Sequence, residues 1–297
     1  MYVEVSLHGI RDRMLALRSL PNFAGMSDES ALRLIEASRE RRFRAGRLLF
    51  SEDAPLDSIY FVIAGKVTVT REGKPFQVAV DTGAIGVVAA LANARTGWRG
   101  VADADTVALE LPAAAFRANL EEDFSLLRNS LRIMSNMALR ARGNLPIQPN
   151  LPAELGAYPD RDLTLVERVI LLRSSPGPFG NANMEAIIDI CRSMEIVRVE
   201  PGHMFFEIDD PSAFSLRVNY GRIRCMSPTG EHADVGAGMV LGVLDAWGSQ
   251  PRSYSARAET QVVAYRSNNE DVLSVLEMHP AVAFKMLVDL ATSLLPR

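Results

Sequence analysis

The sequence predicts an α+β protein, mainly β, made of two tandem β-roll (jelly-roll, or double-stranded β-helix) domains, each flanked by helices. Short segments rich in β-branched and aromatic residues alternate with turn signals, which is typical of such rolls. In each half, segments whose apolar residues have helical spacing precede and follow these strands. Adding 156 to a residue number carries Gly46 onto Gly202, Gly86 onto Gly242 and Leu131 onto Leu287. This constant offset indicates duplication of a whole domain.

The repeat divides the chain into a first domain at 1–142 and a second at 163–297. Between them, 143–162 contains Pro146, Pro149, Pro152 and Pro159 without any hydrophobic period. Proline at this density favours a semi-rigid extended linker.

The first half begins with two predicted helices. The first covers 4–19 and ends at Pro21, because proline cannot continue a helix. The second begins after Ser27, a good N-cap, and runs to about residue 40. Its buried side is predicted to consist of Leu32, Leu34 and Ile35.

The period then changes to that of strands. We expect a strand pair around a glycine turn at 43–50, and strands over 58–70 that break at Gly65. A hairpin turn at 72–74 and strands near 77–80 and 106–111 follow. Pro112 opens a helical tail, and 121–142 has the spacing of an amphipathic helix. A last helix is predicted from Pro280 to Leu295.

The composition is that of a soluble globular protein, with 48% hydrophobic and 23% charged residues and a net charge of −4. This charge argues against a general binder of nucleic acid or membrane surfaces. An arginine run between residues 39 and 47 is the local exception, and we interpret it as a solvated face. Cys191 and Cys225 suit free thiols in a reducing compartment. With neither a signal peptide nor an apolar span, the expected location is cytoplasmic.

One stretch carries a motif. Gly242 stands ten residues before Arg252, in the order Leu-Gly-Val-Leu-Asp followed by Pro-Arg. This stretch resembles the phosphate-binding cassette of cyclic nucleotide-binding domains, whose pattern is roughly F-G-E-L-A-L and then P-R-A-A-T. In that family, backbone N–H groups and the Arg contact the cyclic phosphate, and the Glu accepts from the ribose 2′-hydroxyl. The resemblance implies the β-roll fold and a sensor function.

The second cassette keeps the anion-binding part of this pattern. The candidate ligand residues are Gly242, Val243, Leu244, Arg252 and Ser253. Val243 replaces the Glu and cannot accept the 2′-hydroxyl bond, while Asp245 and Tyr254 replace small residues. Two interpretations stay open. Either cyclic AMP, cyclic GMP, a cyclic dinucleotide or another phosphate-bearing ligand binds, or the pocket is filled and Arg252 makes a salt bridge.

The first cassette has lost both key side chains. Its residues are Gly86, Val87, Arg95 and Thr96, with valine and threonine in the positions of the family's Glu and Arg. Arg95 could substitute if the loop slipped by one residue. Trp98 is expected to fill the remaining space, so this half is predicted to bind no nucleotide.

We therefore expect a non-enzymatic signalling or regulatory protein, since the sequence shows no catalytic motif and no metal-ligand spacing. The alternatives are a sensor acting through the second domain and a ligand-free interaction scaffold. After the last predicted helix the sequence leaves no room for a helix-turn-helix, so DNA is not an expected partner. Because no apolar span is present, a membrane is not an expected partner either. A homodimer built on the 121–142 helix is predicted from its wide apolar face. The alternative is that this helix and the last helix cover each other within one chain.

Overall fold

The structure is a computed structural model that describes residues 9–20, 23–142, 145–146, 151, 157–174 and 182–295. Contacts group the chain into two compact units. Unit 1 is Met1–Ser130 with Leu287–Arg297, and unit 2 is Leu131–Met286.

The roll of unit 1 consists of two four-stranded antiparallel sheets. One has the order β1 (Arg39–Phe43), β8 (Thr106–Pro112), β3 (Ser58–Ala64), β6 (Ala84–Ile85). The other has the order β2 (Leu48–Phe50), β7 (Trp98–Ala102), β4 (Lys66–Arg71), β5 (Lys74–Val80). The inner faces of both sheets supply one core, which includes Tyr60, Val67, Ile85 and Trp98.

Unit 2 repeats this topology strand for strand. Its sheets have the orders β9 (Met194–Val199), β16 (Val262–Asn268), β11 (Phe214–Tyr220), β14 (Val240–Leu241), and β10 (Met204–Phe206), β15 (Ser255–Ala258), β12 (Ile223–Met226), β13 (His232–Val235). Strands β3 and β11, β6 and β14, and β8 and β16 match at the offset of 156 without a shift. The predicted fold class, two tandem β-rolls with flanking helices, is confirmed.

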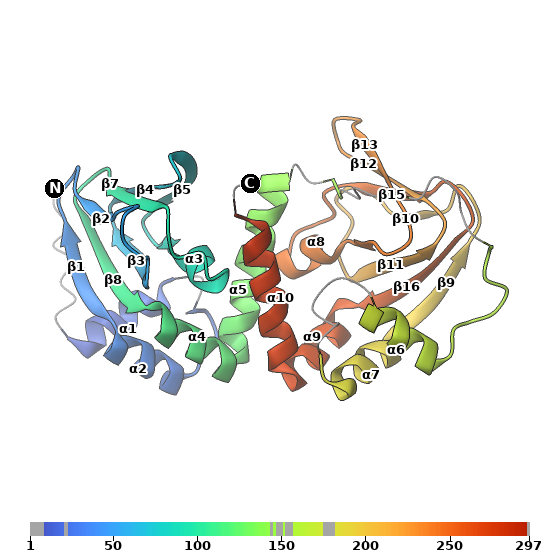
Figure 1. The fold of residues 1–297 in the computed structure, drawn as a ribbon, viewed down its shortest axis with the longest axis horizontal. Coiled ribbons are helices and arrows are strands. Elements are labelled where there is room, and N and C mark those ends of the chain that lie inside the picture. The colour runs from blue at the N-terminus through green and yellow to red at the C-terminus, as the bar shows by residue number, and fades with distance from the viewer. Residues whose placement is uncertain are drawn as a thin grey trace. The chain divides into compact units, whose positions relative to one another are not determined.

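The helices also follow the repeat. In unit 1, α1 (Ile10–Arg18), α2 (Asp28–Ala37) and α4 (Ala113–Glu122) lie at one end of the roll (Figure 1). In unit 2, α6 (Leu165–Ser174), α7 (Met184–Arg192) and α9 (Asn269–Met278) lie at the matching end. The short helices α3 (Val87–Leu91) and α8 (Val243–Gly248) belong to the cassettes.

Local predictions for β1, β2 and α2 were wrong. Strands β1 and β2 do not pair with each other, because β1 pairs with β8 and β2 pairs with β7 in a different sheet. Helix α2 ends at Ala37 rather than near residue 40, since β1 begins two residues later. Leu32 on that helix is 39% exposed, whereas Leu34 and Ile35 are buried as expected.

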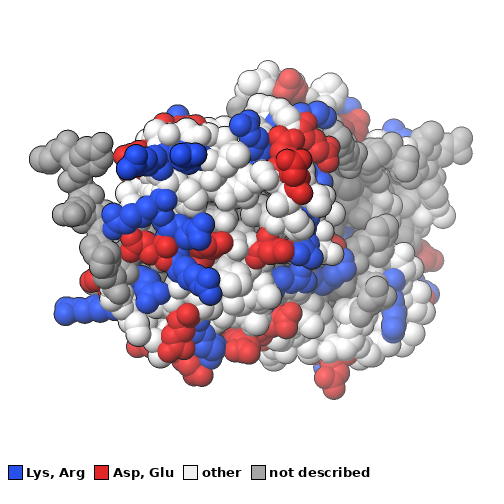
Figure 2. All heavy atoms as spheres, turned by 60° about the vertical axis from the view of Figure 1, so that its left-hand side comes forward, with Lys and Arg blue, Asp and Glu red and all other residues white. Residues whose placement is uncertain are grey.

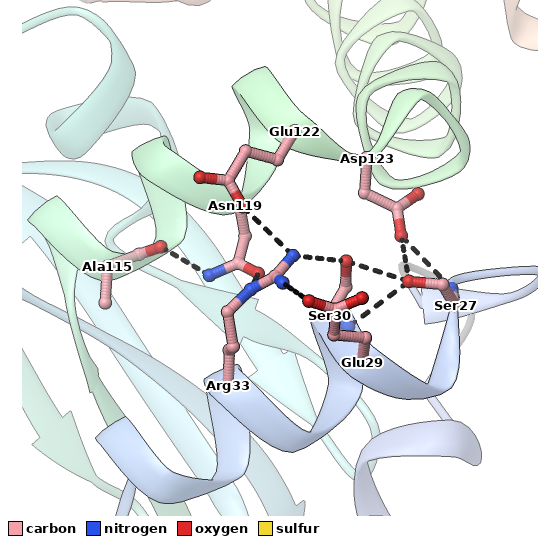
Figure 3. A network of polar contacts seen from close by, with 8 residues as sticks. All are labelled: Ser27, Glu29, Ser30, Arg33, Ala115, Asn119, Glu122 and Asp123. Carbon is pink, nitrogen blue, oxygen red and sulfur yellow. Dashed lines mark hydrogen bonds and ion pairs between the residues drawn. The ribbon is translucent and has the colours of Figure 1, made fainter.

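A polar clasp in unit 1 joins the start of α2 to the helices that follow the roll (Figure 3). Ser27 caps α2 by accepting from the Ser30 N–H, and its own hydroxyl and N–H donate to Asp123. Asp123 also accepts from the N–H of Leu126. The 121–142 helix predicted as one element is therefore broken at Asp123.

Arg33 completes the clasp from the next turn of α2. Its guanidinium forms ion pairs with Glu29 at 2.8 Å and with Glu122 at 3.1 Å (Figure 3). It also donates to Ser30 at 3.0 Å. Arg33 therefore links α2 to the end of α4.

Helices α5 (Phe124–Arg142) and α10 (Pro280–Ser293) each contribute residues to both units. In unit 1, Leu295 packs against the core of the roll, and in unit 2, Leu145 packs against the matching core. The apolar stripes on both helices are buried, including Leu127, Leu131 and Met134 of α5 and Leu287 of α10. The predicted homodimer stays a prediction.

Some predictions concern residues outside the described ranges. These are the start of the first helix, at residues 4–8, and most of the linker at 143–162. We keep 1–142 and 163–297 as a proposal for the extent of the two repeats. None of the described helices is long and apolar enough to cross a bilayer.

Candidate functional site

The second cassette is the turn between β14 and α8 together with the loop that leads to β15. Gly242 has a φ of +74°, a left-handed conformation that favours glycine. A Cβ at this position would collide with the Arg252 guanidinium. Glycine is therefore required here both by the backbone conformation and by the close approach of Arg252.

Arg252 is directed into the protein, not toward an open pocket. It is 1% exposed, and its Nη1 donates to the Gly242 carbonyl at 3.1 Å. Its Nη2 donates to the Phe214 carbonyl, which lies at the start of β11. Two main-chain carbonyls thus occupy the nitrogens that would otherwise bind a phosphate.

Two aromatic rings enclose the same guanidinium. Its Cζ lies 4.2 Å from the centroid of Phe206 and 4.8 Å from that of Phe214. The guanidinium of exposed Arg266 also lies over Phe214, with its Cζ 4.2 Å from the ring centroid. Burial lowers the pKa of Arg252, and the charge of Asp245 partly offsets this effect.

Asp245 binds the cassette loop, not Arg252. Its carboxylate accepts from the Ser253 hydroxyl at 2.6 Å and from the Ser253 N–H at 3.3 Å. Among the described residues no carboxylate forms an ion pair with Arg252, so the predicted salt bridge was wrong. Burial raises the pKa of Asp245, while the hydrogen bond from Ser253 opposes this shift.

The Tyr254 side chain forms a hydrogen bond with the main-chain amide just before α8. Its hydroxyl accepts from the Gly242 N–H at 2.9 Å. The side chain is 4% exposed, and its ring lies 5.5 Å from Phe206. The structure therefore brings Gly242, Arg252 and Ser253 together, but it fills the space between them with protein atoms.

The other two candidate residues add no polar group. Val243 and Leu244 are half-buried in the first turn of α8. Sequence reasoning missed Phe206 and Phe214, the rings that hold Arg252. Phe206 matches Phe50 at the offset of 156, which was a signal, whereas Phe214 matches Ser58 and had none.

The first cassette has the same backbone. Gly86 has a φ of +88° and begins α3, as Gly242 begins α8. Val87 is 5% exposed and belongs to the buried face of the helix. The position that corresponds to Tyr254 is Trp98, which is 2% exposed in the core of the roll.

Trp98 fills this cassette as predicted. Its indole N–H donates to the Ala94 carbonyl, and its ring meets Phe76 at 4.8 Å. The Arg71 guanidinium lies 5.2 Å from the Trp98 ring. Thr96 is exposed, and Arg95, half-exposed, pairs with Asp57 at the surface. Neither side chain provides a buried cation.

Charges on the face of unit 1 alternate in sign. Figure 2 shows basic and acidic side chains interleaved over this face. In the arginine run, Arg41 pairs with Glu110 at 3.6 Å and Arg42 with Glu40 at 2.6 Å. These pairs fit a solvated face rather than a nucleic-acid site. Among the described residues, no group of three metal-ligating side chains comes together.

Comparison with protein families identifies the fold of the first roll. Residues 40–123 match the family described as the cyclic nucleotide-binding domain. The match covers the strands of the first roll, and the second roll has the same strand order. The resemblance drawn from the cassettes is therefore confirmed.

Curated relatives match part of the chain. NTE family proteins of Mycobacterium bovis and Mycobacterium tuberculosis are 33% identical over 132 residues, 44% of this chain. The match covers 23% of each relative, so the chain spans about a quarter of their length.

Solved structures also align over most of the chain. The regulatory subunit of a cAMP-independent protein kinase A from Trypanosoma brucei is 15% identical with a TM-score of 0.35, over 94% of this chain and 91% of that one. The regulatory domain of Toxoplasma gondii PKA, crystallised with cAMP, is 14% identical with a TM-score of 0.35, over 93% and 98%.

Proposed function

We propose that this chain is a non-enzymatic regulatory module that works through protein contacts and has no nucleotide ligand. The observation that supports this proposal is the state of Arg252. Its guanidinium is buried, bonded to two main-chain carbonyls and enclosed by two rings. A ligand phosphate would find its main cationic partner already engaged.

The energy of this arrangement favours the closed state. A phosphate that took an η nitrogen of Arg252 away from its carbonyl would leave that buried carbonyl unpaired, which costs about 1–3 kcal/mol. The entering anion would also approach the carboxylate of buried Asp245. The cassette lacks the acceptor that a ribose hydroxyl needs, since Val243 is apolar. These costs together exceed what one charge-assisted contact returns, about 1.5–3 kcal/mol.

The first roll supports the same function. Trp98 occupies the matching space, and Thr96 provides no cation there. With both cassettes filled, the surfaces of the two rolls are what remains for partner recognition. We propose that the partner is another protein, or another part of a longer chain, since the match covers only 23% of the NTE family relatives.

A second candidate function is a weak phosphate sensor in unit 2. It is favoured by the strand topology that unit 2 shares with residues 40–123, which match the cyclic nucleotide-binding domain, and by the Nε of Arg252, which has no hydrogen-bond partner among the described residues. A cyclic nucleotide or cyclic dinucleotide would then displace the Phe214 carbonyl and the Tyr254 hydroxyl.

A thermal-shift screen against cyclic AMP, cyclic GMP and cyclic dinucleotides separates the two functions. A ligand that binds only the folded state at 100 times its Kd raises stability by about 2.7 kcal/mol. The regulatory module without ligand predicts no shift with any of these nucleotides. A saturable shift that Arg252→Lys removes would establish the sensor.

The oligomeric state is independent of this choice. The homodimer built on α5 stays a prediction. Light scattering at micromolar concentration decides it. A mass near 32.5 kDa would exclude the dimer, and twice that mass would support it.

A further inference from the structure

We propose that Tyr254 acts as an internal ligand of the second cassette, and that it determines the specificity of the site by excluding anions. This proposal rests on the proposed function, in which the intact cassette is closed. It adds that one side chain closes it, and that the cation behind this side chain can still bind an anion.

The hydroxyl of Tyr254 replaces a ligand oxygen. It accepts from the Gly242 N–H at 2.9 Å, so a main-chain donor at the cassette turn is satisfied from inside the protein. Burial raises the pKa of Tyr254, which keeps this oxygen a neutral phenol at ordinary pH. The amide therefore has a permanent, uncharged acceptor.

The ring of Tyr254 fills the adjoining space. Tyr254 and Arg252 both contact Gly242, one at its N–H and the other at its carbonyl. Both also meet the ring of Phe206, at 5.5 Å and 4.2 Å between the respective centres. Removing the phenol ring would therefore open a volume bordered by the Gly242 amide and the Arg252 guanidinium.

Arg252 is the group in this volume that calls for an anion. It is 1% exposed, and its Nε has no hydrogen-bond partner among the described residues. No described carboxylate forms an ion pair with it, because Asp245 is engaged by Ser253. A buried guanidinium without an ion pair is costly, and a small anion beside it would lower that cost.

The repeat provides a matched control inside the same molecule. Trp98 stands at the position of Tyr254, and Thr96 stands at the position of Arg252. Truncating Trp98 would open a volume in unit 1 that lacks the cassette arginine, and the cation beside it is Arg71, 5.2 Å from the Trp98 ring. A difference between the two truncations therefore tests the cassette position as a whole, and Arg252→Lys tests the guanidinium itself.

The experiment uses the full chain and three probes: cyclic AMP, cyclic GMP and inorganic phosphate. Tyr254→Ala, which restores the small residue of the family pattern, is titrated by calorimetry beside the wild type. Trp98→Ala is the control for cavity formation. Tyr254→Ala with Arg252→Lys tests the role of the guanidinium, because lysine keeps the charge but loses the planar fork.

We expect Tyr254→Ala to bind at least one probe with a Kd of about 1 mM or tighter, whereas the wild type and Trp98→Ala show no saturable heat. Adding Arg252→Lys should weaken this binding about 10- to 100-fold, the range for one charge-assisted hydrogen bond. Equal binding of phosphate and cyclic nucleotide would define a simple anion site. Preference for a cyclic nucleotide would show that sugar or base contacts also form.

Two further variants are made in case Tyr254→Ala fails to fold or Asp245 repels the anion. Tyr254→Val places a β-branched residue, which favours extended backbone, directly before β15, and Asp245→Asn removes the nearby charge while its amide oxygen can still accept from Ser253. If all folded variants, including Tyr254→Ala with Asp245→Asn, bind no probe, the proposal is overturned while the proposed function stands. Saturable binding to the wild type would instead refute the proposed function.

Discussion

The two cassettes have one backbone and two different fillings. Gly86 and Gly242 adopt the same left-handed conformation and begin equivalent short helices. Trp98 fills the first cassette as part of an apolar core, with a surface threonine beside it. Tyr254 fills the second through a hydrogen bond to the turn, with a buried arginine beside it. The comparison teaches that the backbone of a binding motif can persist after its ligand space has been taken by side chains.

The two units also differ in charge at one position of the repeat, Glu110 in unit 1 and Arg266 in unit 2. Glu110 on β8 accepts from the Tyr60 hydroxyl at 3.1 Å. Burial and the negative charge of Glu110 raise the pKa of Tyr60 to about 12. At the offset of 156 stands Arg266, whose guanidinium covers Phe214. Unit 1 thus presents a carboxylate where unit 2 presents a cation, which makes unit 2 the better host for an anion.

The largest effect is expected from the apolar filling. Trp98→Ala should destabilise unit 1 by about 3–5 kcal/mol, because it removes a large buried side chain and leaves a cavity. Thr96→Ala is its control and should change the free energy of unfolding by less than about 0.5 kcal/mol, since Thr96 is exposed. Urea unfolding measures both. Similar values for the two variants would show that Trp98 does not support the core.

A smaller but still large effect is expected from the polar filling. Arg252→Ala should cost about 2–4 kcal/mol, because the carbonyls of Gly242 and Phe214 lose their donor and the ring cage collapses only partly. Arg95→Ala removes the arginine of the first cassette and serves as the control in unit 1. It should cost less than about 1 kcal/mol, since its ion pair with Asp57 is exposed. An Arg252 variant as stable as the Arg95 variant would contradict the bonding described for Arg252.

The smallest effect concerns the helix clasp and depends on pH. Burial alone would raise the pKa of Asp123, but hydrogen bonds from Ser27 and Leu126 outweigh it and lower the pKa. A depressed pKa means that the carboxylate stabilises the fold above its unfolded value of about 3.9, and that this contribution disappears as pH falls through the folded value.

Asp123→Asn should therefore destabilise unit 1 by about 1 kcal/mol at pH 7, and the difference from wild type should shrink toward pH 3. Urea unfolding at several pH values measures this. Unit 2 has His279 at the matching position, 3.0 Å from Asp189, and provides no equivalent carboxylate. A difference that stays constant between pH 3 and 7 would show that the charge of Asp123 does not matter.

The sequence allowed the fold to be predicted because glycines and strand periods repeat at one offset. Gly46, Gly65 and Gly86 mark positions of positive φ, and so do their counterparts in unit 2. The filling by Trp98 was also predictable, since a large apolar side chain replaces a small one. What failed was local: β1 and β2 look like a hairpin in sequence, yet their partners are distant strands.

The closed state of the second cassette was not predictable to the same degree. The Phe214 carbonyl that binds Arg252 is 38 residues away in sequence, and a carbonyl leaves no mark in the residue pattern. A salt bridge for Arg252 was one of two open interpretations, but the buried carboxylate of Asp245 accepts from Ser253 instead. Such outcomes depend on how loops cross in space, which the spacing of a motif does not encode.

Calorimetric titration of the wild-type chain with cyclic AMP tests the closed second cassette most directly. If Arg252 and the Gly242 amide are satisfied from within, titration should give only heats of dilution. Saturable binding to the wild type that is lost in Arg252→Lys would contradict it, because the guanidinium would then be free to leave its two carbonyls for a phosphate.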